Sequence, residues 1–99
     1  MMQYEYQLTR KATKRVEYAR ATAASPDIAR AHIVLYYGPQ FDVANWCDIN
    51  AAHQIVGEID CSNFPMSEYA WLMREAKRTE ALFSVTQAQK QAHDQRATQ

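Results

Sequence analysis

The stretch SPDIARAHIVLYYGP, residues 25–39, decides how this chain folds, because it carries both a helix start and a helix stop. At its beginning, the Ser25 hydroxyl can accept a hydrogen bond from an amide of the first helical turn. Pro26 has no amide proton to leave unpaired, and Asp27 places a negative charge at the positive end of the helix dipole. These three residues predict the start of a helix.

The end of the same stretch is equally well marked. Gly38 can take the left-handed conformation that closes a helix, and Pro39 cannot continue one. We therefore predict a helix from about Pro26 to Tyr37, although the apolar run Ile33–Tyr37 alone would also suit a buried strand. One face of this helix is expected to be apolar, formed by Ile28, Ala31, His32 and Leu35.

Strands are predicted on both sides of this helix. Tyr4, Tyr6 and Leu8 alternate with polar residues, which is the pattern of a half-buried strand. The stretch Ala12–Ala23 suits either a strand or a helix, and we favour a strand because the next helix starts directly after it. Gln54–Cys61 alternates again and predicts a further strand.

The remaining segments complete an α+β prediction. Phe41–Ala52 has apolar residues spaced by three and is expected to be a short helix or irregular. The longest helix should open at Ser67-Glu68, with a buried stripe and with Trp71 off that stripe. The stripe consists of Tyr69, Leu72, Met73, Ala76 and Phe83. We expect one domain over residues 1–86, in which a small antiparallel sheet of about three strands packs against two main helices. Residues 87–99 are expected to form a polar, Gln-rich helical extension or mobile tail.

Composition and charge place the chain among ordinary globular domains. Its 99 residues are 47% hydrophobic and 22% charged, with a formal net charge of zero. The charge is unevenly spread, because residues 31–65 contain four acids and no Lys or Arg. No apolar run is long enough for a membrane helix, and no signal peptide is evident. With only Cys47 and Cys61, both expected to be reduced, a cytoplasmic protein without a membrane partner is predicted.

The sequence contains none of the enzyme signatures that can be recognised without an alignment. Its only glycines, Gly38 and Gly57, are too far apart for a phosphate-binding loop, and it has no nucleophile elbow or zinc-binding helix. Ligand-type side chains do gather in one segment, but the two thiols are isolated from each other, unlike the close pairs of zinc sites. These residues are Cys47, Asp48, His53, Glu58, Asp60 and Cys61. We therefore predict no catalytic residue, no metal and no cofactor.

A basic N-terminal segment leaves nucleic-acid binding as an alternative function. Its cations stand beside Tyr4, Tyr6 and Tyr18, and a sheet can hold single-stranded nucleic acid by phosphate contacts and aromatic stacking. However, the cations are split between the two faces of the predicted strands, and the neutral net charge provides no electrostatic footprint. The candidate residues are Arg10, Lys11, Lys14, Arg15 and Arg20.

The leading hypothesis is a non-enzymatic protein-binding module that occludes a partner's surface, with a homodimer left open as an alternative. The chain has more aromatic residues than two small helices can easily bury, and partly exposed aromatic side chains commonly anchor interfaces. An acidic rim would suit a partner with a basic surface. The candidate residues are Tyr36, Tyr37, Phe41, Asp42, Trp46, Asp48 and Trp71, and the competing interpretation is that these aromatics complete the core. Small size and neutral charge are compatible with inhibitors that phages and mobile elements make against host machinery, including anti-CRISPR proteins, as an association of class and not a sequence match.

Overall fold

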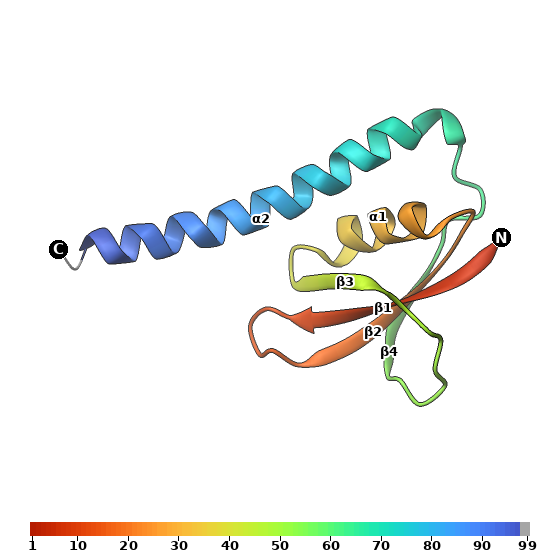
Figure 1. The fold of residues 1–99 in the computed structure, drawn as a ribbon, viewed down its shortest axis with the longest axis horizontal. Coiled ribbons are helices and arrows are strands. Elements are labelled where there is room, and N and C mark those ends of the chain that lie inside the picture. The colour runs from red at the N-terminus through yellow and green to blue at the C-terminus, as the bar shows by residue number, and fades with distance from the viewer. Residues whose placement is uncertain (98–99) are drawn as a thin grey trace.

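The computed structural model describes the backbone of residues 1–97 and the side chains of residues 1–83. Within that part of the chain it confirms the predicted α+β architecture, with a sheet, two α-helices and one short 3-10 helix (Figure 1). The elements, in order, are β1 (Met2–Arg10), β2 (Val16–Ala23), α1 (Pro26–Tyr37), β3 (Phe41–Cys47), β4 (Ile55–Asp60), η1 (Met66–Glu68) and α2 (Tyr69–Ala97).

The sheet has four strands in the order β3-β1-β2-β4, one more than the sequence predicted. β1 runs antiparallel to both of its neighbours, whereas β2 and β4 are parallel. The strands predicted at Tyr4–Leu8, within Ala12–Ala23 and within Gln54–Cys61 are confirmed as β1, β2 and β4. The sheet is therefore mixed, and its two edge strands are β3 and β4.

The additional strand is β3, so the prediction of a short helix or irregular segment was wrong for its residues. The pairing with β1 explains the misleading spacing of apolar residues. Tyr6 faces Trp46 and Leu8 faces Val43, so two residues of β3 lie opposite the single residue Gln7. This β-bulge places Val43 and Trp46, three positions apart, on the same side of the sheet. A spacing typical of a helical turn was thus produced by an irregular strand.

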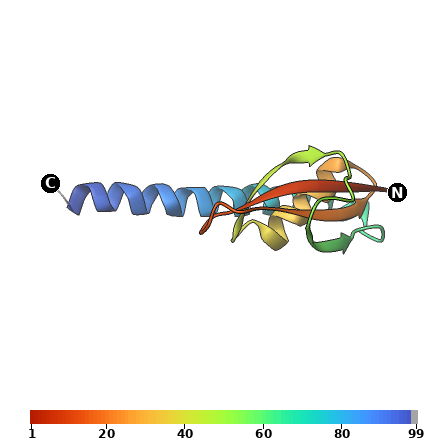
Figure 2. The same cartoon turned by 90° about the horizontal axis from the view of Figure 1, so that it is seen from below.

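The molecule has three layers, in which α1 lies between the sheet and α2 (Figure 1). The central position of α1 explains why it is buried on more than one side, at Ile28, Ala29, Ala31, Ile33 and Val34. From β1, the Tyr6 hydroxyl donates a hydrogen bond to the Pro26 carbonyl, with 2.6 Å between the two oxygens. From α2, Leu72 and Ala76 complete the core. Seen from below, β1 and β2 lie in front of α1, and α2 extends to the left beyond the sheet (Figure 2).

The bounds predicted for α1 are confirmed, but both of its ends work differently from the prediction. The Ser25 hydroxyl does not cap a backbone amide; it donates to the carboxylate of Asp27, which also accepts a hydrogen bond from the Tyr69 hydroxyl. Gly38 is right-handed, with φ −52°. It is a glycine because a Cβ there would collide with the carbonyl oxygen of Val34. Close approach, and not left-handed geometry, therefore requires a glycine at this position.

α2 follows η1 and packs against α1, as the longest predicted helix should. Leu72 and Ala76 of its predicted stripe are buried, and Trp71 lies off the stripe, 47% exposed. Among the residues that the structure describes, neither α2 nor α1 is long and apolar enough to cross a membrane. The polar extension predicted for residues 87–99 lies outside the described side chains and stays a prediction.

Candidate functional site

The aromatic residues predicted to bind a partner differ in exposure. Tyr36 is 73% exposed and Trp46 is 53% exposed, similar to Trp71. Phe41, in contrast, is buried in the core, where its ring packs edge-on against Tyr37 and below the Arg10 guanidinium at 4.4 Å. Phe41 therefore completes the core, as the competing interpretation of the sequence allowed, although it also lines the hollow beside Tyr36 and Tyr37.

These candidate residues also lie in separate places. Tyr36 and Tyr37 line an open hollow of about 460 Å³ beside Val56 and Pro39, near the start of β3. Trp46 lines another hollow, at the opposite end of β3. Trp71 lies on neither, since it belongs to the first turns of α2. The predicted aromatic residues therefore form three separate features and not one surface.

The hollow beside Trp46 combines aromatic and aliphatic side chains, and we call its lining the Trp46 surface. It measures about 210 Å³ and combines the N-terminal half of β1 with the end of β3 and the residues after it. The Trp46 ring packs edge-on against Tyr4, with 6.1 Å between ring centroids and 72° between planes. Because Tyr4 is itself packed against the core, Trp46 is held in place while half of it faces solvent. The lining residues are Met2, Gln3, Tyr4, Trp46, Cys47, Asp48 and Ile49.

Arg30 holds the backbone on which Trp46 sits. Its guanidinium donates to the carbonyl oxygen of Val43 at 2.8 Å and approaches that of Ala44 at 3.4 Å. The same group forms an ion pair with Glu80 of α2 at 2.7 Å. The bulged part of edge strand β3 is therefore tied to both helices, and its carbonyls are occupied at a place where an edge would otherwise be open.

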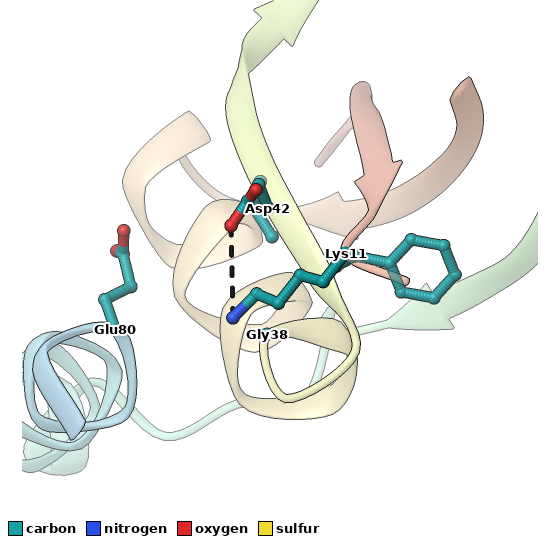
Figure 3. Close-up of a pocket in the computed structure, with 6 residues that line it drawn as sticks. Lys11, Gly38, Asp42 and Glu80 are labelled. Atoms are coloured by element: carbon teal, nitrogen blue, oxygen red, sulfur yellow. Dashed lines mark ion pairs between the residues drawn. The ribbon is translucent and has the colours of Figure 1, made fainter. Parts of the chain in front are cut away.

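A smaller hollow of about 110 Å³ lies at the other end of β3 and is lined by charged residues (Figure 3). Lys11 extends over Gly38 toward Asp42, with 3.9 Å between the amine and a carboxylate oxygen. Glu80, on the neighbouring helix, is bound by Arg30. Because these charges already have partners, we assign this hollow no ligand. Asp42, predicted as a partner contact, belongs here and not to the Trp46 surface.

The bases considered for nucleic-acid binding are largely engaged within the protein. Arg10 forms an ion pair with Glu17 at 3.1 Å, and Lys11 lies beside Asp42. Arg20 is paired with Glu5 at 3.0 Å and with Glu58 at 3.8 Å. Lys14 and Arg15 lie in the exposed turn between β1 and β2. Cations that are already neutralised release few counterions on meeting a phosphate backbone, so this segment offers less to nucleic acid than its composition suggests.

A second feature, which the sequence analysis missed, is a buried cluster around Glu5 of β1. Glu5 lies on the face of the sheet opposite the helices, yet its side chain is fully buried. One carboxylate oxygen accepts from Arg20 at 3.0 Å, and the other lies 2.5 Å from Nδ1 of His53. Burial alone would raise the pKa of Glu5, but hydrogen bonds from His53 and Arg20 outweigh it, and the pKa is lowered.

Cys47 lies beside Glu5, and Tyr18 lies beside His53. The Cys47 thiol lies 3.8 Å from the Glu5 carboxylate and 3.6 Å from the Glu5 carbonyl oxygen. Burial and the neighbouring Glu5 charge raise the pKa of that thiol. The His53 ring stacks on Tyr18, with 3.7 Å between centroids and 2° between planes. We call Glu5, Cys47 and His53 the Glu5 cluster.

The cluster is closed by the connection between β3 and β4. These strands are at opposite edges of the sheet, so residues 48–54 must cross β1 and β2. His53 contacts Glu5 on the way, and the Asn50 carbonyl accepts from Arg20 at 3.4 Å. Glu5 could not be identified from the sequence because its place in the alternation is that of a solvent-facing residue. The signal that pointed here was the gathering of ligand-type residues in the middle segment.

Of the six residues noted in that segment, Cys47 and His53 are brought together. Glu58 lies 3.8 Å from Arg20, and Asp60 accepts a hydrogen bond from the Ser62 amide at 2.9 Å. Cys61 is buried in the core, where burial raises its pKa, and both cysteines are free thiols. Asp48 lines the Trp46 surface instead.

Comparisons with protein-family models, with curated proteins and with solved structures gave no match to this chain. The functional proposals below therefore rest on its geometry and chemistry.

Proposed function

We propose that the protein is a non-enzymatic binding module. Its Trp46 surface binds a protein partner and thereby covers part of that partner's surface. The observation that carries this proposal is that Trp46 is half-exposed but ordered. Its ring packs against Tyr4, and Arg30 donates a hydrogen bond to the Val43 carbonyl at the bulge of β3. A large aromatic side chain that is already ordered loses little entropy when a partner covers it. Trp and Tyr are also the residue types that most often dominate interface energetics.

The exposed residues around Trp46 support docking rather than catalysis. Met2 and Ile49 extend the apolar lining at solvent-exposed positions. The nearest nucleophile-type group is Cys47, whose raised pKa is the opposite of what an attacking thiolate needs. An apolar patch with polar edges is typical of an interaction surface.

The charges favour a partner with a basic rim. Asp48 is exposed at the edge of the Trp46 surface, and residues 31–65 contribute no Lys or Arg. The two arginines that approach this region from other elements, Arg20 and Arg30, are occupied by carboxylates. A basic rim on the partner would therefore be attracted to this side and not repelled. We further propose that the module acts in the cytoplasm, which the two free thiols support.

The two tryptophans provide a matched test, because Trp71 has nearly the same exposure as Trp46 but lies on α2. Immobilised full-length protein is used to capture binders from lysate, and the affinity of the recovered partner is then measured with Trp46→Ala and Trp71→Ala. We expect Trp46→Ala to weaken binding by about 30-fold, the value for an interface hot spot of about 2 kcal/mol. Trp71→Ala should leave the affinity unchanged.

Three outcomes would redirect the proposal. Recovery of nucleic acid, with an affinity that falls steeply as salt rises, would favour the basic N-terminal segment instead. A stable dimer by size-exclusion with light scattering that Trp46→Ala dissociates would make a second copy the partner. Equal loss of binding in both tryptophan variants, with unchanged melting temperatures, would show that the Trp46 surface is not the site.

A further inference from the structure

We propose that the Glu5 cluster is a zinc site, in which the Glu5 carboxylate, the Cys47 thiolate and the His53 imidazole each donate one ligand. Three elements bring these residues together: β1, the last residue of β3, and the connection that follows it. Their ligand atoms all lie within 4.8 Å of one another. This proposal does not depend on the partner-binding function, although Cys47 also lines the Trp46 surface.

One ligand distance already matches what a metal ion would impose, and a second requires one side chain to move. With zinc–ligand bonds of about 2.0–2.3 Å, tetrahedral ligand atoms lie roughly 3.3–3.8 Å apart. The Cys47 sulfur is already 3.8 Å from Oε2 of Glu5. Nδ1 of His53 is closer to that oxygen, at 2.5 Å, and must move outward by about 1 Å to admit the ion. His53 belongs to the connection rather than to a strand, so it is the ligand that is freest to make this movement.

The donor set selects a transition metal. One sulfur, one nitrogen and one oxygen suit zinc, whereas calcium and magnesium prefer all-oxygen sites. The ion pair between Glu5 and Arg20 would require no thiol, and the thiol–carboxylate contact is a weak hydrogen bond. A metal ligand is a role that would account for Cys47 lying beside both the carboxylate and the carbonyl oxygen of Glu5.

The surroundings would orient the ligands and balance the charge. Arg20 binds Oε1 of Glu5 and leaves Oε2 for the metal, as hydrogen-bonded carboxylates do in metal sites. Tyr18 fixes the plane of the His53 ring by stacking. The charges of zinc and Arg20 would be offset by Glu5, the Cys47 thiolate and Glu58, which lies 3.8 Å from Arg20. Three protein ligands leave a fourth position for water on the side where Cys47 and His53 are partly exposed.

The test uses the full-length, tag-free chain after removal of metal with a chelator. Zinc affinity and stoichiometry are measured by competition with a chromophoric chelator. We expect one zinc per chain, with affinity lowered more than about tenfold in Cys47→Ser and in His53→Ala, since losing even an outer-shell partner costs that much. Cys61→Ser and His32→Ala remove the same residue types elsewhere and should bind as the parent does. Glu5→Ala is avoided because it would remove the closer partner of Arg20, which is partly buried, and leave it the more distant Glu58.

Binding of Co²⁺ gives a second measurement, which would not depend on Cys47 if that residue contributed only to the stability of the fold. Co²⁺ bound by a thiolate shows a sulfur-to-metal charge-transfer band, which should be present in Cys61→Ser and lost in Cys47→Ser. The proposal is overturned if the parent protein binds zinc no more tightly than the double variant Cys47→Ser/His53→Ala. It is also overturned if binding persists in that variant with the same stoichiometry, which would place the ion on other residues.

Discussion

The two faces of β1 both bury side chains, but by different means. On the helix side, Tyr6 and Leu8 pack into an apolar core against α1. On the other side, Glu5 is equally buried, yet it is covered by the connection between β3 and β4 and surrounded by Arg20, His53 and Cys47. The first face buries its side chains by apolar packing, whereas the second buries Glu5 through hydrogen bonds and ion pairs. Neighbouring residues of one strand can therefore be buried for unrelated reasons.

The comparison implies that the helix face contributes more to stability. Leu8→Ala removes a fully buried side chain from the apolar core and should lower the free energy of unfolding by about 2–5 kcal/mol. Urea denaturation measures this loss, with Val16→Ala, at an exposed position of β2, as the control that should change stability by less than about 0.5 kcal/mol. A loss below about 1 kcal/mol for Leu8→Ala would mean that this face is not the main source of stability.

This division also explains what the sequence could predict. The alternation of Tyr4, Tyr6 and Leu8 reports the apolar face directly, because periodicity reflects burial against a hydrophobic layer. The Ser-Pro-Asp and Gly-Pro signals located α1 correctly for the same kind of local reason, although Gly38 acts through close approach. Glu5 has no local signal, since its burial depends on a connection more than 40 residues later in the chain.

The same limit applies to β3 and to the surface beside it. A bulge set by pairing with β1 altered the spacing of Val43 and Trp46, so the local pattern indicated the wrong element. Trp46 and Trp71 were correctly expected to be partly exposed, but nothing in the sequence separated them from the buried Phe41. Which aromatic residues remain outside the core depends on which elements are adjacent in space, and that is decided by tertiary packing.

The polar face can be examined by a double-mutant cycle on Glu5 and Arg20, carried out with chelator present so that no metal contributes. Glu5→Gln and Arg20→Gln are measured singly and together by urea denaturation. We expect a coupling free energy of about 1–2 kcal/mol, below the apolar loss at Leu8, because Arg20 is partly exposed and solvent screens the pair. A coupling larger than the loss in Leu8→Ala would reverse the order of the two faces.

A carboxylate on the helix side sharpens the contrast further, because Asp27 is exposed and is held by neutral donors instead of cations. Hydrogen bonds from Ser25 and Tyr69 lower its pKa below the ordinary value of 3.8. A carboxyl group whose pKa is lowered by folding stabilises the folded state at pH values above its pKa in the unfolded chain. That stabilisation is lost as the pH falls through its pKa in the folded protein. At pH 7 the parent should therefore have a larger free energy of unfolding than Asp27→Asn, by less than about 1 kcal/mol. This difference should shrink below about pH 4.

Tyr69→Phe separates the hydrogen bond from the charge at this position. It removes one hydrogen-bond donor to Asp27 and leaves the carboxylate in place. In the Tyr69→Phe background, Asp27→Asn should therefore change the free energy of unfolding less at pH 7. The effect of Asp27→Asn should also disappear at a higher pH than it does in the parent. Thermal melts from pH 7 down to pH 3 in the four proteins provide the measurement. If the difference grows on acidification, Asp27 is destabilising when charged, and neutral donors alone do not hold a carboxylate at the start of α1.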